Sequence, residues 1–191
     1  VLSSKWRMQE NFFTQAWKSS VKLVDELKKQ LNTGLVSLTG EMRRKCEIIN
    51  KVEILCASEK EITLPESSVA VKMIKCSEKD FYKKLFETTA GENFPVAEIK
   101  ISGTEKNEEE IFSENKLQYI EPELRESAEI ISLAKQNKIP KLIEVTDLKG
   151  ILHNHTKYSD GMNTLREMAE YCKQLGYEYL GICDHSQSAF Y

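Results

Sequence analysis

The most constraining feature of this sequence is a short strand–helix–strand pattern near its C-terminus. Ile151–His155 and Tyr177–Cys183 are apolar runs with the length and composition of strands. Between them, Thr164 and Glu167 have the spacing of a capping box that opens a helix, and Gly176 follows as a stop signal. Two strands joined by one helix within about 35 residues are expected to run parallel. The pattern therefore predicts an α/β fold.

Four potential metal ligands lie at the ends of these two strands. His153 and His155 are two residues apart, so a regular strand would point both imidazoles to the same face. Asp160 follows in a Ser-Asp-Gly turn, and His185 follows the second strand. Because the carboxyl ends of parallel strands share one edge of a sheet, we expect these side chains to converge. Imidazole and carboxylate ligands together suit Zn²⁺, Mn²⁺ or Fe.

Simpler interpretations exist for some of these residues. Histidines two apart can be a chance pair on a half-exposed strand, although the turn and the second strand make that less favoured here. Asp184 could orient a ligating histidine, ligate directly, or act only as a cap or turn residue. Lys157 and Tyr158 are candidates for contact with a substrate phosphate, with plain loop surface as the alternative.

The first hundred residues predict a second α/β region. Apolar residues at three- and four-residue steps indicate a helix over residues 5–31, which Asn32-Thr33-Gly34 ends. Ser77 and Asp80 predict the start of another helix that runs at least to Phe86. The strand candidates are Leu35–Leu38, Val52–Ala57, Val69–Ile74 and residues 96–101.

The middle of the chain has a different character. Glu105–Glu114 is an acidic run, which is typical of a solvated helix face. Ile139-Pro140 breaks the helical pattern that precedes it. We therefore divide the chain into residues 1–103, a helical linker over 104–147, and a C-terminal region over 148–191.

Composition excludes several classes of protein. The 191 residues are 40% hydrophobic and 30% charged, which is typical of a globular chain. No apolar run approaches the roughly 18 residues of a membrane span. The N-terminal stretch has neither an initiator Met nor an apolar segment, so we expect no signal peptide and further sequence upstream. Five cysteines without a C-x-x-C pair favour the reducing cytoplasm, and a net charge of -3 does not suggest binding of nucleic acid by charge alone.

The segments HNHTKYSDG and GICDHS resemble the first two motifs of the PHP (polymerase and histidinol phosphatase) domain. This resemblance implies a distorted TIM-like barrel that holds two or three divalent metals and hydrolyses phosphoesters. It places His153, His155, Asp160 and His185 on ligand positions. About 40 residues of such a domain are present, and the later ligands of the family would lie beyond Tyr191.

The upstream sequence resembles bacterial family X DNA polymerases. YIEPELRESAEI and IPKLIEVTDLKG resemble the connector to their PHP domain, and TGEMRRKCEIINKVEIL resembles their palm motif. The family has Asp residues where this chain has Lys51, Glu53 and Lys72. Nucleotidyl transfer with two metals needs carboxylates there, so the resemblance implies a nucleotidyltransferase-like palm remnant without that activity.

Together these features predict a mixed α/β chain, with a palm remnant over 1–103 and the first βαβ unit of a TIM-like PHP barrel over 148–191. The expected function is that of a metal-dependent phosphoesterase, a 3′-5′ exonuclease in DNA repair, with these 191 residues alone inactive. The alternatives are an active family X DNA polymerase and a non-catalytic DNA-binding or interaction module. DNA is the expected partner, no membrane is expected, and the substrate, the metal and the oligomeric state stay open.

Overall fold

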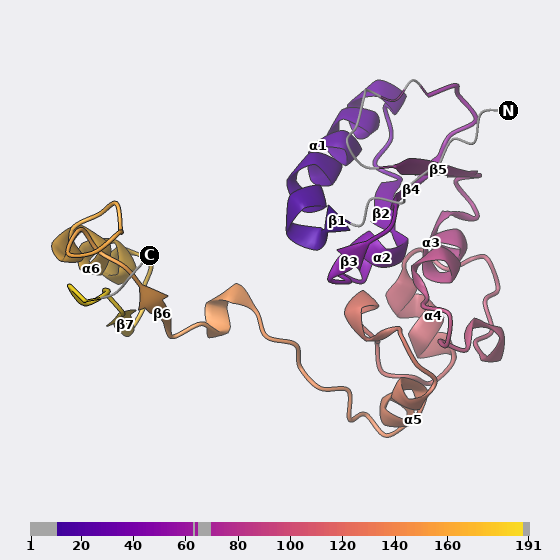
Figure 1. Ribbon diagram of the computed structural model, residues 1–191. Coiled ribbons are helices and arrows are strands. Elements are labelled where there is room, and N and C mark those ends of the chain that lie inside the picture. The colour runs from indigo at the N-terminus through magenta and orange to yellow at the C-terminus, as the bar shows by residue number, and fades with distance from the viewer. Residues whose placement is uncertain (1–10, 63, 65–69, 189–191) are drawn as a thin grey trace, which may run out of the picture. The chain divides into compact units, whose positions relative to one another are not determined.

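Strand β4, Val52–Ala57, is the centre of the N-terminal sheet and is buried on both faces. The computed structural model describes residues 11–62, 64 and 70–188. In it, β4 pairs antiparallel with β2, Val36–Thr39, and parallel with β5, Val71–Cys76, in the order β2-β4-β5 (Figure 1). The expected strand over Val52–Ala57 is confirmed, and its neighbours are shifted by one or two residues from the prediction.

Helices cover the two faces of this sheet. Helix α1, Phe13–Leu31, packs against the side chains of Val52, Ile54 and Cys56. Helix α3, Phe81–Thr89, packs against Leu55 and Ala57 on the opposite face. Alternate residues of β4 therefore enter two different cores, which explains why its sequence is apolar throughout.

The N-terminal helix begins later than the periodicity predicts. Residues 11 and 12 form the short strand β1, Asn11–Phe12, which pairs antiparallel with β3, Ile48–Ile49, so the predicted helix is wrong there. The predicted positions 5–10 lie outside the described residues. At its other end α1 stops where predicted, because Asn32 adopts a left-handed conformation with φ 52°.

Two further expectations for unit 1 need correction. Helix α3 begins at Phe81, since residues 77–80 form a turn in which Ser77 Oγ accepts from Asp80 N at 3.2 Å. Residues 96–101 form no strand. Val96–Glu98 is a 3-10 turn that follows Pro95, and Ile99 enters a core shared with helices α4, Glu108–Glu114, and α5, Glu129–Lys135.

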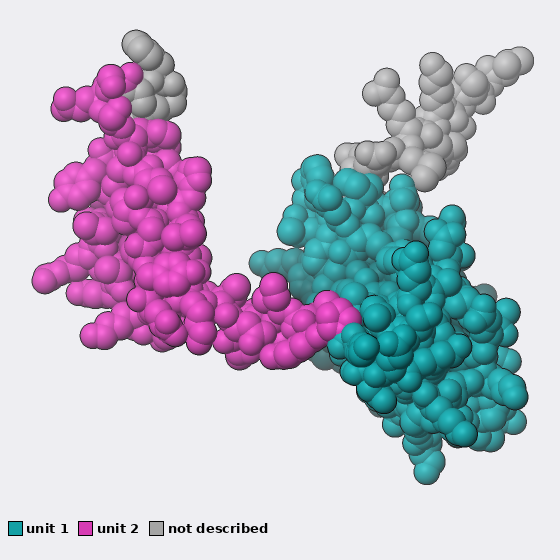
Figure 2. Space-filling view, turned by 90° about the horizontal axis from the view of Figure 1, so that it is seen from below, with its two compact units in different colours: residues 1–139 teal, residues 140–191 magenta. Residues whose placement is uncertain are grey.

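The chain divides into two compact units, residues 1–139 and 140–191 (Figure 2). The division falls at the Ile139-Pro140 break. Residues 104–139, which the sequence suggests as part of a linker, share an apolar core with α3 in unit 1. No helix in the described part of the chain is long and apolar enough to cross a membrane.

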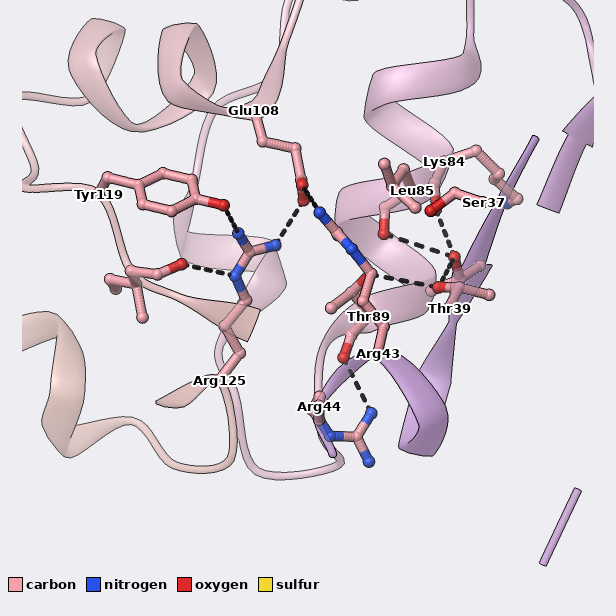
Figure 3. A network of polar contacts seen from close by, with 12 residues as sticks. Ser37, Thr39, Arg43, Arg44, Lys84, Leu85, Thr89, Glu108, Tyr119 and Arg125 are labelled. Atoms are coloured by element: carbon pink, nitrogen blue, oxygen red, sulfur yellow. Dashed lines mark hydrogen bonds and ion pairs between the residues drawn. The ribbon is translucent and has the colours of Figure 1, made fainter. Parts of the chain in front are cut away.

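A buried ionic network joins α2, Gly40–Arg43, to α4 inside unit 1 (Figure 3). Glu108 accepts hydrogen bonds from both Arg43 and Arg125, and its side chain is only 4% exposed. The guanidinium of Arg125 lies over the rings of Phe86, Phe112 and Tyr119, 5.0 to 5.5 Å from their centroids. The expectation of a solvated acidic face is therefore wrong at Glu108, and also at Glu105, which is buried.

Unit 2 has the strand–helix–strand order that the sequence predicts. Strand β6, Gly150–Asn154, pairs parallel with β7, Tyr179–Ile182, and helix α6, Leu165–Gln174, connects them. Thr164 and Glu167 form the expected capping box, since Thr164 Oγ1 accepts from Glu167 N at 3.3 Å and Glu167 accepts from Thr164 N at 2.7 Å. The structure is a mixed α/β fold with small sheets.

Candidate metal centre

Strand β6 brings two imidazoles together by an irregular backbone, not by regular alternation. His153 has a positive φ of 62°, and the register with β7 shifts between Ile151 and Asn154. The strand ends at Asn154, so the predicted strand is one residue too long at this end. The rings of His153 and His155 nevertheless lie 5.3 Å apart, centroid to centroid. A left-handed conformation at a residue other than glycine is costly and concentrates at functional sites.

The turn after β6 folds back over His155. Both Ser159 N and Gly161 N donate to Thr156 O, at 3.0 and 2.9 Å. A Cβ atom added to Gly161 would lie 2.0 Å from the carbonyl oxygen of His155, so only glycine fits this close approach. The turn thereby brings Asp160 beside the histidine ring.

Three of the four predicted ligands converge. One nitrogen or oxygen atom from each of His155, Asp160 and His185 lies within 4.8 Å of the others. Asp160 Oδ1 is 3.1 Å from His155 Nδ1, and Asp160 Oδ2 is 3.7 Å from His185 Nε2. His153 is not part of this group, and it contacts the group through the ring of His155.

The donor atoms of this group suit a divalent cation. His155 Nδ1 is buried and, within the described part of the chain, makes no hydrogen bond of acceptable geometry. A buried nitrogen without such a bond is costly in a protein and is available to ligate a metal. Desolvation acts to raise the pKa of Asp160, but hydrogen bonds from its own backbone and from Ser159, with the nearby imidazoles, hold that pKa below its usual range. Two imidazoles and an ionised carboxylate match the preferences of Zn²⁺, Mn²⁺ and Fe.

Asp184 lies next to this group but bonds to the turn. Its carboxylate accepts from Thr156 N, Thr156 Oγ1 and Ser159 Oγ, each at 2.6 Å. These hydrogen bonds, from Ser159 foremost, lower the pKa of Asp184. The sequence left the role of Asp184 open and did not identify Thr156 or Ser159. Both residues carry a hydroxyl and lie between the candidate ligands His155 and Asp160 in the sequence, and this placement could have identified them as hydrogen-bond donors of the site.

The two predicted substrate contacts lie on the rim of a cavity. Lys157 and Tyr158 are exposed, and the Tyr158 side chain is 83% exposed. They line a cavity of about 480 Å³ together with Thr156, Thr164, Leu165, Arg166 and Ala169. Arg166 is a second positively charged residue that lines this cavity. The sequence analysis did not identify it, because its position in the first turn of α6 does not indicate a ligand contact.

The positions matched to the polymerase palm gather around one carboxylate in unit 1. Glu53 and Lys72 are register partners on β4 and β5. Glu53 Oε1 lies 3.0 Å from Lys72 Nζ and 3.1 Å from Lys51 Nζ. Gly40 has a φ of 59°, and a Cβ there would lie 2.4 Å from Glu53 Oε2. Glycine thus leaves room for the Glu53 carboxylate, which two ammonium groups neutralise.

Comparison with curated proteins finds a relative for half of the chain. Over 96 residues the chain is 41% identical to the DNA polymerase/3'-5' exonuclease PolX of Bacillus subtilis (strain 168). This stretch is similar to a bacterial DNA polymerase. It covers 50% of this chain and 16% of that relative. No known family profile matches the chain.

Proposed function

We propose that these residues belong to a metal-dependent phosphoesterase that acts as a 3′-5′ exonuclease on DNA, in repair. The observation that carries the proposal is the group of His155, Asp160 and His185, in which His155 Nδ1 is buried and makes no hydrogen bond of acceptable geometry to any described residue. The name of the Bacillus relative, which includes a 3'-5' exonuclease, supports the same reaction class. DNA would be the partner, and the cytoplasm the compartment.

In this proposal the chain's own residues bind the metal ion and orient the phosphodiester. His155, Asp160 and His185 hold the cation, and His153 completes the set from its place beside His155. Lys157 and Tyr158, with Arg166, contact the phosphodiester from the adjoining cavity. When bound, Zn²⁺, Mn²⁺ or Fe supplies polarisation of a phosphoryl oxygen and a water of lowered pKa, and the resemblance implies two or three such ions.

The palm remnant has no nucleotidyl transfer activity in this proposal. Support comes from Lys51 and Lys72, whose ammonium groups lie at 3.1 and 3.0 Å from Glu53 and occupy the surroundings that two Mg²⁺ ions would need. The alternative is an active family X DNA polymerase, which the name of the Bacillus relative favours, since it includes a DNA polymerase. Primer extension separates the two, as argued below.

Removal of one imidazole tests the metal site. His155→Ala should lower the bound Mn²⁺ or Zn²⁺ per chain and leave the fold intact, because the partly exposed ring belongs to none of the apolar cores of the described residues. Metal content is measured by mass spectrometry beside the melting temperature of the metal-free chain. Glu178→Gln, which changes an exposed carboxylate paired with Lys149, is the matched control. Equal metal content in His155→Ala and in the unsubstituted chain would contradict the proposal.

A further inference from the structure

Asp184 is bound by three hydrogen bonds from a single turn. Its Oδ1 accepts from Thr156 N and Ser159 Oγ, and its Oδ2 accepts from Thr156 Oγ1, all at 2.6 Å. Thr156 is fully buried, and its hydroxyl also accepts from Tyr158 N at 3.1 Å. The Thr156 hydroxyl is thus oriented from both sides. Hydrogen bonds to a carboxylate are stronger than those between neutral groups, so this contact fixes the turn.

The same turn carries the carboxylate of the candidate metal centre. Thr156 O accepts from Ser159 N and Gly161 N, which closes the turn on either side of Asp160. Asp184 follows β7, whereas the turn follows β6, so the contact ties the ends of both strands. If Asp184 did not bind the turn, the segment that contains Asp160 would be held mainly by the hydrogen bonds of Ser159 N and Gly161 N to Thr156 O, which lie within the turn itself.

The geometry distinguishes the role of Asp184 from that of the candidate metal ligands. Both of its oxygens are engaged by Thr156 and Ser159, and the group of donor atoms within 4.8 Å does not include it. Direct ligation is therefore less well supported than a role in the turn.

We propose that Asp184 is a positioning residue that fixes the 156–161 turn and thereby presents Asp160 to His155 and His185 before a metal binds. The consequence for metal affinity rests on the proposed function, whereas the ordering of the turn does not. A ligand that is already in place costs less entropy when the cation binds, so loss of the clamp should weaken binding without removal of a ligand.

Thr156→Val tests the proposal, because valine keeps the shape of threonine and removes the hydroxyl. Thr156→Val and Asp184→Asn should each weaken Mn²⁺ binding about 10- to 100-fold, as loss of an outer-shell partner does. Thr156→Ser, which keeps the hydroxyl, should retain the affinity. Glu178→Gln is the control, and the dissociation constant is measured by calorimetry well below the melting temperature of each variant. If the unsubstituted chain binds Mn²⁺, an equal affinity in Thr156→Val would overturn the proposal.

Amide hydrogen exchange of the metal-free chain gives a second measurement. Ser159 N and Gly161 N should exchange faster in Thr156→Val and in Asp184→Asn, whereas α6 should be unchanged. Unchanged exchange at both amides would overturn the proposal. Faster exchange would support it even if the unsubstituted chain bound no Mn²⁺, a result that would contradict the proposed function alone.

Discussion

At the residue scale, the proposal of a palm remnant without activity rests on the positive charges beside Glu53. Lys51 and Lys72 both place their Nζ atoms within 3.1 Å of its Oε1. A Mg²⁺ ion beside Glu53 would be attracted by its carboxylate but repelled by both ammonium groups. The lysine side chains are about half exposed, so these ion pairs add little to the stability of the fold.

The two lysines beside Glu53 lead to a prediction for primer extension. The protein should not extend a DNA primer with Mg²⁺ or Mn²⁺ and four nucleotides, and Glu53→Gln should change nothing in that assay. The same variant should lower the free energy of unfolding by about 1 kcal/mol or less, because both lysine partners of Glu53 are about half exposed. Template-directed extension that disappears in Glu53→Gln would contradict the proposal and favour an active polymerase.

At the scale of elements, the sequence predicted correctly those helices and strands that a short stretch of neighbouring residues specifies. The run Val52–Ala57 is apolar because it is buried on both faces, and the Thr164–Glu167 box is complete within four residues. The convergence of His155, Asp160 and His185 was predictable in the same way, because each of them follows a strand end, and their role as ligands stays a prediction. The left-handed His153 was not, since no local signal in the sequence marks it.

Other elements depend on contacts that no local pattern contains. Residues 96–101 alternate like a strand, but Ile99 is drawn into the core of α4 and α5. Glu108 lies in an acidic run and is buried because Arg43, 65 positions away, and Arg125 neutralise it. Such pairings depend on the tertiary structure, which overrides what charge composition indicates.

Glu108 also gives a prediction at this scale. Glu108→Ala leaves the buried guanidinium of Arg125 and the partly buried one of Arg43 without their carboxylate, and should cost about 3–5 kcal/mol of unfolding free energy. Glu109→Ala, at the exposed neighbour, should cost no more than about 0.5 kcal/mol. Urea denaturation of both variants at neutral pH measures the difference. Equal stabilities would mean that the network contributes nothing.

The pH dependence of the network has a defined sign. Burial acts to raise the pKa of Glu108, but the bonds and charges of Arg43 and Arg125 outweigh it and lower the pKa below the ordinary value of 4.5. A carboxyl with a lowered folded-state pKa stabilises the fold above its unfolded-state pKa and loses that effect as the pH falls through the folded-state value. The stability gap between the unsubstituted chain and Glu108→Ala should therefore narrow below about pH 4.5.

At the scale of the whole molecule, the two units differ in how much apolar surface they bury. Unit 1 has cores on both sides of β4 and a third around Phe86 and Phe112. In unit 2 the buried residues among those described are Thr156 and Cys172, whereas Leu152 and Tyr179 are 69% and 51% exposed. Apolar burial is the main favourable term in folding, so unit 2 has little to offset the entropy of its chain.

This contrast predicts that the units fold differently when separated. Residues 11–139 made alone should unfold in one cooperative transition, whereas residues 140–191 should show weak protection and no sharp transition, since about 50 residues with so small a core are marginal. Circular dichroism during heating and amide exchange measure both pieces, with the 191-residue chain as the reference. The exposed apolar side chains of β6 and β7 also lead us to expect association of the smaller piece. A cooperative, monomeric transition for residues 140–191 would show that the βαβ unit is stable without further structure.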